Sequence, residues 1–183
     1  MNSSGNYLFK SARLGFRNWQ ETDLAALSSI NSDEKVMEFF PATKTAEETA
    51  DFIQRMQQEY CEKGFCYFAA DDLSTNELIG FIGLHEQVFE AAFTPCIDIG
   101  WRLRKRSWNK GFATEGARAC LRYAFDQLHL KKIVSIAPEI NSKSENIMRR
   151  IGMTKKGVFK HPLLKDFPKL ESCVLYEIDR PEL

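Results

Sequence analysis

The sequence predicts an α/β (α+β) fold in which helices cover the faces of a mixed β-sheet. Strand-like segments dominate the first half of the chain, and the second half alternates helices with strands. The clearest strand-to-helix unit covers residues 97–126. Apolar residues first recur at every second position, as in a strand, and after a basic loop they recur every three or four residues, as in a helix. A chain of 183 residues suits one domain with one hydrophobic core.

The first half is predicted to form a strand, three helices and two further strands. These are a strand at 7–17, a helix that opens at 18–23, a short helix at 36–40, a helix that opens at Thr45, and strands at 66–71 and 77–86. Thr45 and Glu48 form a capping box ahead of the third helix, and Gly64 is its expected stop. Gly80 and Gly83 weaken the last strand, which indicates a bulge or a close backbone approach.

The second half alternates strands and helices more regularly. Its predicted elements are a strand at 97–103, a helix from Thr114 to Leu128, a strand at 131–138, a helix at 141–151, and strands at 155–161 and 172–178. Ile97, Ile99 and Trp101 alternate with polar or small residues, which is the pattern of a half-buried strand. Gly152 is the expected stop of the second helix. No repeat, low-complexity segment or linker interrupts this series.

Composition narrows the class of function. The 25 Lys and Arg residues balance 25 Asp and Glu residues, which argues against a dedicated nucleic-acid binder. The five cysteines form no Cys-x-x-Cys pair, so we expect no zinc site and a reduced, cytoplasmic protein. The N-terminus lacks the apolar segment of a signal peptide, and no apolar run is long enough to span a membrane.

The loop before the long helix has the chemistry of an anion site. Gly111 and the small Ala113 would let phosphate oxygens approach the backbone N–H groups at a helix N-terminus. Positive charge is added by Arg104, Lys105, Arg106 and Lys110. The loop is neither a P-loop nor a dinucleotide-binding fingerprint. On these residues alone, a phosphate site and an ordinary capped turn remain equally open.

Three motifs in order carry a resemblance to a known family. The run Trp108-x-x-Gly111-x-Ala113-Thr114-Glu115 resembles the acyl-CoA pyrophosphate loop of GNAT-superfamily N-acetyltransferases of the RimJ/RimL-like branch. Residues 99–103 (IGWRL) resemble that family's splayed fourth strand, whose backbone pairs with the pantetheine arm. Asn141-x-x-Ser144, followed by Ile151-Gly152-Met153, resembles a third family segment. The resemblance extends from about residue 9 to residue 178.

The resemblance implies a GNAT-like, mostly antiparallel sheet of about six to seven strands with a splayed fourth/fifth strand pair. It implies one N-acetyltransferase domain over residues 1–183, of which 1–6 are expected to be loose. Acetyl-CoA would be the co-substrate, without a metal, and the acceptor either a protein N-terminal amine or a small-molecule amine. A monomer or homodimer is expected, without nucleic-acid or membrane partners. The implied cofactor contacts are Trp101, Leu103, Arg106, Trp108, Asn109, Lys110, Gly111, Phe112, Ala113, Thr114, Asn141 and Asn146.

Acetyl transfer to an amine needs a proton acceptor near the amine and a donor near the sulfur. Asp98 is the first choice for the base, at the position where relatives usually carry Glu; the alternative is a solvent-facing strand residue. Glu86 and His85 are weaker choices. Many relatives use a Tyr in the helix after the fifth strand as the donor, and residues 141–153 contain no Tyr. The resemblance therefore indicates Ser144, which stands where the RimJ/RimL-like pattern places Ser, and the alternative is that it only caps its helix.

Two further features bear on the acceptor and on the rival function. Phe39 and Phe40 either form an aromatic wall of the acceptor pocket or pack in the core. Cys173 stands where a common family pattern has His, and its use as a nucleophile is not expected, because no basic group adjoins it. A non-catalytic acyl-CoA sensor or interaction module on the same fold stays the alternative function.

Overall fold

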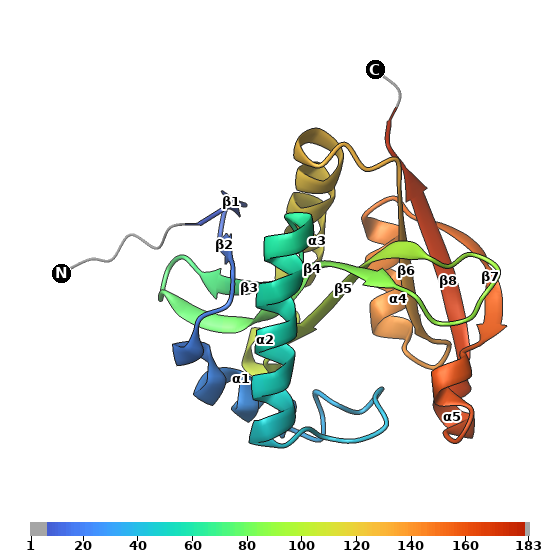
Figure 1. Ribbon diagram of the computed structural model, residues 1–183, viewed down its shortest axis with the longest axis horizontal. Coiled ribbons are helices and arrows are strands. Elements are labelled where there is room, and N and C mark those ends of the chain that lie inside the picture. Colours follow the sequence, from blue (N-terminus) through green and yellow to red (C-terminus); the bar gives the residue numbers. More distant parts are fainter. Residues whose placement is uncertain (1–6, 182–183) are drawn as a thin grey trace.

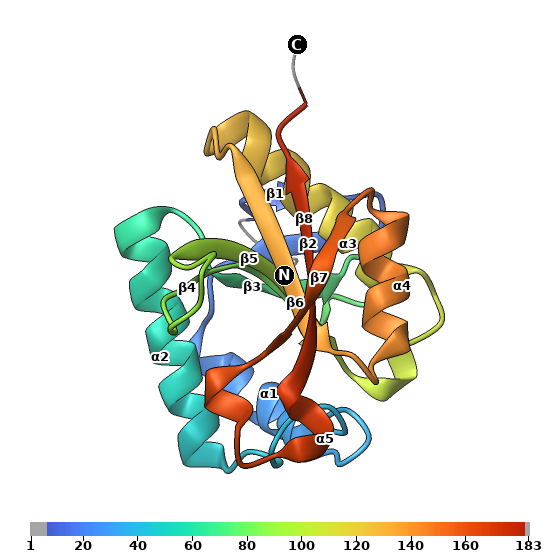
Figure 2. The same ribbon diagram turned by 90° about the vertical axis from the view of Figure 1, so that its right-hand side faces the viewer.

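The computed structural model describes residues 7–181 and shows an eight-stranded sheet with helices on both faces (Figures 1 and 2). The strands are β1 (Phe9–Lys10), β2 (Leu14–Arg17), β3 (Tyr67–Asp72), β4 (Glu77–Gln87), β5 (Cys96–Leu103), β6 (Lys132–Pro138), β7 (Thr154–Lys160) and β8 (Ser172–Asp179). The helices are α1 (Leu24–Asn31), α2 (Ala46–Lys63), α3 (Phe112–Arg122), α4 (Ser142–Arg150) and α5 (Pro168–Glu171). The expectation that residues 1–6 are loose falls outside the described residues.

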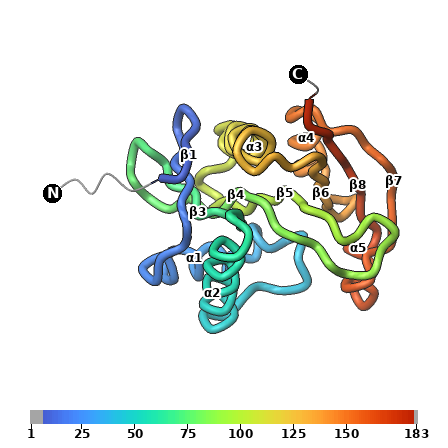
Figure 3. Tube along the Cα trace, turned by 45° about the horizontal axis from the view of Figure 1, so that its top comes forward, coloured from blue at the N-terminus to red at the C-terminus, as the bar shows by residue number. Residues whose placement is uncertain are grey.

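The strand order is β1-β2-β3-β4-β5-β6-β8-β7, and every neighbouring pair is antiparallel except β5 and β6, which are parallel. Seen along the chain in Figure 3, the first five strands build one half of the sheet and the last three build the other. The predicted mixed, mostly antiparallel sheet is therefore confirmed, with eight strands in place of six or seven.

The extra strand comes from the segment predicted as one strand at 7–17, which is a hairpin of β1 and β2. Phe9 pairs with Phe16, and their rings stack at 4.6 Å between centroids. The turn between the strands contains no Gly, Pro, Asn or Asp, and its one common turn residue is Ser11, whose hydroxyl accepts from the Leu14 N–H at 3.1 Å. A distant residue also holds the turn: the Glu115 carboxylate accepts hydrogen bonds from the Ser11 hydroxyl and the Arg13 N–H, at 2.7 and 2.8 Å.

Two predicted helices differ from the structure. The segment at 36–40 forms successive turns, in which Asp33 accepts a bond from the Lys35 N–H at 2.8 Å. Its five residues are too few to complete a stable helix before Pro41. The long helix begins at Phe112, two residues earlier than predicted, and ends as a π-helical turn over Tyr123–Gln127.

The capping and glycine predictions are confirmed. Thr45 and Glu48 make both bonds of the capping box, and Gly64 ends α2 in the left-handed region with φ +76°. Gly80 has φ +138° and lies at a bulge between β3 and β4. A Cβ on Gly80 would lie 2.0 Å from the Arg102 carbonyl oxygen, so only Gly permits β5 to approach β4 this closely.

The two faces of the sheet are covered by different helices (Figure 2): α1 and α2 lie on one, α3 and α4 on the other. Ile82, which pairs with Trp101, is directed toward α3, since it would touch a Cβ placed on Gly116. Phe81, which pairs with Arg102, faces α2, where its ring lies 5.4 Å from Phe52. Side chains alternate along a strand, so Trp101 faces α3 while Arg102 and other even-numbered residues of β5 face α2.

All five cysteines are free thiols in the structure. Among residues 7–181, no group of three or more His, Cys, Asp or Glu side chains is arranged to hold a metal ion. No helix in the described part of the chain combines the length and apolar character needed to cross a bilayer.

Candidate active site

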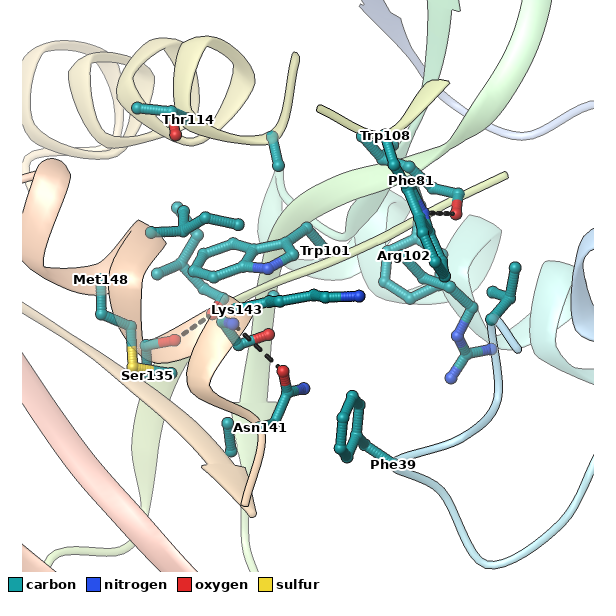
Figure 4. A pocket seen from close by; sticks show the side chains of 18 of the residues that line it. Phe39, Phe81, Trp101, Arg102, Trp108, Thr114, Ser135, Asn141, Lys143 and Met148 are labelled. Atoms are coloured by element: carbon teal, nitrogen blue, oxygen red, sulfur yellow. Dashed lines mark hydrogen bonds between the residues drawn. The ribbon is translucent and has the colours of Figure 1, made fainter. Parts of the chain in front are cut away.

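A cleft of about 490 Å³ opens where β5 and β6 separate at the middle of the sheet (Figure 4). The two strands share one registered pair, Asp98 with Val134. One residue further along, the buried Ser135 hydroxyl donates to the Ile99 carbonyl at 2.9 Å. Beyond this bond, residues 100–103 of β5 line the cleft. The splayed strand pair predicted from the resemblance is therefore confirmed, between β5 and β6.

The edge of β5 offers backbone hydrogen-bonding groups to this cleft. The Ile99 carbonyl points toward β6, because it accepts from Ser135 there. Trp101 lies two residues further along the strand, so its N–H and C=O point in the same direction. The next such carbonyl, on Leu103, accepts a bond from the Trp108 indole N–H at 2.7 Å, which fixes the loop against the strand. An extended ligand in the cleft would therefore find Trp101 as its main-chain partner.

The N-terminus of α3 forms another part of the cleft wall. Gly111 is the N-cap residue, in the left-handed region at φ +79°, and no side chain caps the helix there. Its carbonyl accepts the first helical bond, from the Glu115 N–H at 3.0 Å, which leaves the N–H groups of residues 112–114 without intrahelical partners. The nearest atom to a Cβ on Gly111 would be Arg13 Nη2, at 3.5 Å, so the backbone is open to approach. This is the arrangement that binds phosphate at helix N-termini.

The basic residues of the preceding loop lie elsewhere. The guanidinium groups of Arg104 and Arg106 both bind the Glu77 carboxylate, at 2.8 and 2.9 Å. Arg106 and Lys110, predicted as cofactor contacts, are both absent from the residues that line the cleft, as are Arg104 and Lys105. Glu77 on a neighbouring strand holds two of these four charges, and the expectation that the four add positive charge at the mouth of the site stays a prediction.

A different cation lies in the cleft. Lys143, at the start of α4, lines it, with Nζ 5.1 Å from the centre of the Trp108 ring (Figure 4). The other predicted cofactor contacts do line the cleft: Trp101, Leu103, Trp108, Asn109, Gly111, Phe112, Ala113, Thr114, Asn141 and Asn146. Lys143 lies within the Asn141-x-x-Ser144 motif, and this position is the one sequence signal that pointed to it.

The start of α4 settles what caps that helix. Asn141 is the N-cap residue, and its side-chain oxygen accepts from the Ser144 N–H at 3.1 Å. The alternative that Ser144 itself caps the helix is therefore wrong. Ser144 is half-buried and lines the cleft beside Asn141. Since capping uses the Asn141 oxygen, its amide N–H groups remain available as donors.

Asp98 lies at the bottom of the cleft with 5% of its surface exposed. The alternative of a solvent-facing strand residue is therefore wrong. The Tyr67 hydroxyl lies 2.8 and 3.0 Å from the two carboxylate oxygens and donates to them. Burial raises the pKa of Asp98 to about 6, against the opposing effect of the Tyr67 hydrogen bond. A carboxyl with a pKa near neutrality is suited to accept a proton at physiological pH.

The two weaker choices for the base are occupied elsewhere. His85 Nδ1 lies 2.6 Å from a Glu59 carboxylate oxygen, and Glu86 pairs with Lys63. Neither His85 nor Glu86 lines the cleft. Tyr67 does line it, and sequence reasoning missed this residue because an isolated Tyr in a strand carries no motif. Burial and the Asp98 carboxylate both raise the pKa of its hydroxyl, so it stays protonated and donates.

Aromatic side chains line the α2 side of the cleft, and they are Phe39, Phe40, Phe52, Tyr67 and Phe81. Figure 4 shows Phe39 opposite Asn141 across the cleft. This position agrees with the aromatic wall predicted for Phe39 and Phe40. Cys173 lies outside the cleft lining, and its buried thiol donates to the Leu170 carbonyl. Burial raises its pKa to about 11, which leaves it a poor nucleophile.

Comparison with known proteins identifies this architecture. Residues 13–154 match the acetyltransferase (GNAT) domain family. The uncharacterised N-acetyltransferase YnaD of Bacillus subtilis is 31% identical over 149 residues, 81% of this chain and 83% of its own. The crystal structure of an acetyltransferase (GNAT family) from Bacillus anthracis has a TM-score of 0.79 at 28% identity, and covers 94% of this chain and 98% of its own.

A third relative shares the fold at lower identity. RimL, described as a ribosomal L7/L12 α-N-protein acetyltransferase in complex with coenzyme A, has a TM-score of 0.74 at 17% identity and covers 92% of this chain and 95% of its own. The splayed strands, the uncapped glycine turn and the family match over 142 of 183 residues (13–154) agree. The chain belongs to the GNAT acetyltransferase family.

Proposed function

We propose that the protein transfers the acetyl group of acetyl-CoA to an amine by direct attack, with both substrates bound at once. One observation carries this proposal: a single cleft joins the uncapped N-terminus of α3, the open edge of β5 and the buried Asp98. The first two features suit the phosphate and amide groups of acetyl-CoA, and the third suits an amine. The named activities of the relatives support the same reaction.

The cofactor half of the cleft is built from backbone groups. The N–H groups of residues 112–114 would hold the pyrophosphate of acetyl-CoA, with Lys143 nearby as a cation. Trp101 would pair with the pantetheine arm through its main chain, and Asn141 would donate its amide N–H to the same arm. Acetyl-CoA supplies the activated acetyl group when bound. No metal is needed to hold it, because the donors are main-chain and side-chain amides.

The acceptor half supplies the proton chemistry. The amine nitrogen attacks the thioester carbon, so a C–N bond forms, the C–S bond breaks and one amine proton must leave. Asp98 takes this proton, either directly or through a water molecule. The water relay is considered because Asp is one methylene shorter than the Glu usual in relatives, so its carboxylate reaches less far toward the amine. The Trp101 N–H stabilises the charge that develops on the thioester oxygen, and the Ser144 hydroxyl donates to the departing sulfur. A positioned base typically contributes about 10²- to 10⁴-fold in rate.

Two acceptor classes follow from the relatives and the cleft: a protein N-terminal amine, as named for RimL, or a small-molecule amine. The rival function, a sensor that binds acyl-CoA without catalysis, would need the same cofactor half. It would not need a carboxyl that is buried at the far end of the cleft with its pKa raised toward neutrality. Asp98 therefore favours the enzyme over the sensor.

The test combines binding and turnover. Calorimetric titration of the purified chain with acetyl-CoA should give a Kd in the micromolar range or below, and thiol release should follow when amines and N-terminal peptides are added. Asp98→Asn should leave the Kd for acetyl-CoA unchanged and lower kcat by about 10²- to 10⁴-fold. Absence of acetyl-CoA binding would mean that the turn at Gly111 only begins the helix, and it would contradict the proposed function. Binding without turnover of any amine would favour the sensor.

A further inference from the structure

Arg102 carries a positive charge in the wall of the cleft without an acidic partner. It lies on β5, on the same face as Asp98, and its Nη1 donates to the Asn31 side-chain oxygen at 2.8 Å. Its Nε atom is buried and has no hydrogen-bond partner. Among residues 7–181, no carboxylate lies within ion-pair distance of this guanidinium. Half-buried as a residue, Arg102 keeps part of its surface open to the cleft.

Another arginine of the same sheet, Arg17, does have acidic partners. Arg17, on β2, pairs with Asp23 and Asp71, each at 2.7 Å. That guanidinium is neutralised by two buried carboxylates, so its charge is satisfied within the protein. Arg102 has only an uncharged amide as partner. A charged group removed from water without a counter-charge or a full set of hydrogen bonds is costly.

Aromatic rings stabilise the Arg102 cation in part. Its guanidinium carbon lies 4.2 Å from the centre of the Phe40 ring and 5.1 Å from that of Phe81. Such contacts favour a cation but provide no lone pair for an N–H donor in the guanidinium plane. Burial lowers the pKa of Arg102 to about 10, so the group remains charged at neutral pH. An anion in the cleft would find a charged donor already in place.

The nearby acidic groups do not supply that anion. Arg102 also borders a second cavity of about 630 Å³, on which Glu48, Asp51 and Lys44 of α2 and the turn before it lie. Glu48 is engaged by Lys44 at 2.8 Å and by the capping box of α2. Asp51 is exposed. Figure 4 shows Arg102 leaving β5 on a different side from Trp101, next to Phe81 and away from the α3 helix.

We propose that Arg102 binds an acidic group on the acceptor, so that the substrate of this enzyme is an amine that also carries a carboxylate or a phosphate. This inference rests on the proposed acetyl transfer. Asp98 and Arg102 are four residues apart on one strand face, which separates their Cα atoms by about 13 Å. The reactive amine and the acidic group are therefore separated by several bonds. The planar fork of a guanidinium suits an oxyanion with two oxygens in one plane.

The test uses matched amines that differ in one acidic group. The pairs are γ-aminobutyrate and its amide, O-phosphoethanolamine and ethanolamine, and the peptide amides Ala-Glu and Ala-Gln. The wild type should show a kcat/KM about 10- to 100-fold higher for the acidic member of at least one pair, as expected for a charge-assisted hydrogen-bonded pair. The pair with the largest ratio distinguishes carboxylate from phosphate and small amine from peptide.

The variants assign this preference to one residue. Arg102→Gln should bring the ratio close to one, and Arg102→Lys, which keeps the charge and loses the fork, should give an intermediate ratio. Arg55→Gln is the matched control, because Arg55 is an exposed arginine on the neighbouring cavity and should leave the ratio unchanged. Equal rates for all pairs in an active wild type, or a preference that Arg102→Gln retains, would overturn the inference.

A binding measurement covers the case in which no amine of this panel reacts. The Nε–H resonance of Arg102 in ¹⁵N-labelled protein with coenzyme A bound should shift when the acidic amines are added and stay fixed with their neutral partners. A shift without turnover would support the anion site and count against the proposed acetyl transfer. An unmoved resonance would overturn the anion site, whatever the enzyme activity.

Discussion

Replacing Asp98 with Asn should change how the stability of the fold depends on pH. Burial moves the pKa of this carboxyl from 3.8 to about 6 in the folded protein. Below pH 3.8 both the folded and the unfolded chain hold the proton, and Asp98 adds no penalty. Between pH 3.8 and 6 the unfolded chain has released the proton while the folded chain retains it, so the free energy of unfolding falls as pH rises.

The size of this effect follows from the shift. Each pKa unit corresponds to about 1.4 kcal/mol, so ionised Asp98 lowers the free energy of unfolding by about 3 kcal/mol above pH 7. The side-chain amide of the Asp98→Asn variant cannot ionise and would escape this penalty. Urea unfolding of both proteins at intervals from pH 4 to pH 8 measures it. The variant should gain about 3 kcal/mol relative to wild type across that range, because all other titrating groups are common to both.

A pH-independent difference between the two stability curves would refute the reasoning. It would mean that Asp98 ionises equally easily in the folded and unfolded chain, and the argument for a base with a raised pKa would fail with it. A constant offset added to the pH-dependent difference reports only the general effect of the amide and does not count against the reasoning. The comparison does not depend on knowing the acceptor, so it can precede any search for a substrate.

Substitutions at four further positions test the site and the fold. Tyr67→Phe removes a hydrogen bond that favours ionised Asp98, so the acid limb of the kcat/KM profile should move up by about one pH unit; an unmoved limb would contradict the contact. Gly111→Asp should abolish acetyl-CoA binding in calorimetry, while Gly111→Ala, without the charge, should weaken it less. Ser144→Ala should lower kcat less than Asp98→Asn does, and complete loss in a folded variant would contradict this order. Gly80→Ala should cost at least about 2 kcal/mol in urea unfolding, because its Cβ would collide with the β5 backbone; stability within about 0.5 kcal/mol of wild type would contradict this.

Sequence reasoning succeeded where the cause of the structure is local. The Thr45–Glu48 capping box, the stop at Gly64 and the bulge at Gly80 each depend on a few neighbouring residues, and each is present. The splay between β5 and β6 was inferred from ordered motifs that resemble a family, rather than from any local pattern.

Reasoning failed where the cause is a distant partner. The turn between β1 and β2 has Ser11 as its one local signal and is also held by Glu115, about a hundred residues away, which nothing near Ser11 in the sequence marks. The basic loop led us to predict that Arg106 contacts the cofactor. That contact stays a prediction, but the ion pair that Arg106 makes with Glu77 on a neighbouring strand was not foreseen. The sequence gives the sign of a side chain's charge, but only the folded structure shows which opposite charge it pairs with.

Asp98 and Arg102 carry this point into the function. Both are charged groups on the α2 face of β5, and neither has an opposite charge bound to it among the described residues. The same fold neutralises Arg17 with two carboxylates. We therefore expect a ligand to supply the opposite charges that Asp98 and Arg102 lack within the protein. An acceptor that arrives with an ammonium group and an acidic group would satisfy both residues at once: the first charge is discharged by proton transfer to Asp98, and the second keeps the substrate on Arg102 while the acetyl group moves. Asp98 and Arg102 together therefore predict the chemistry of the acceptor: one amine and one acidic group.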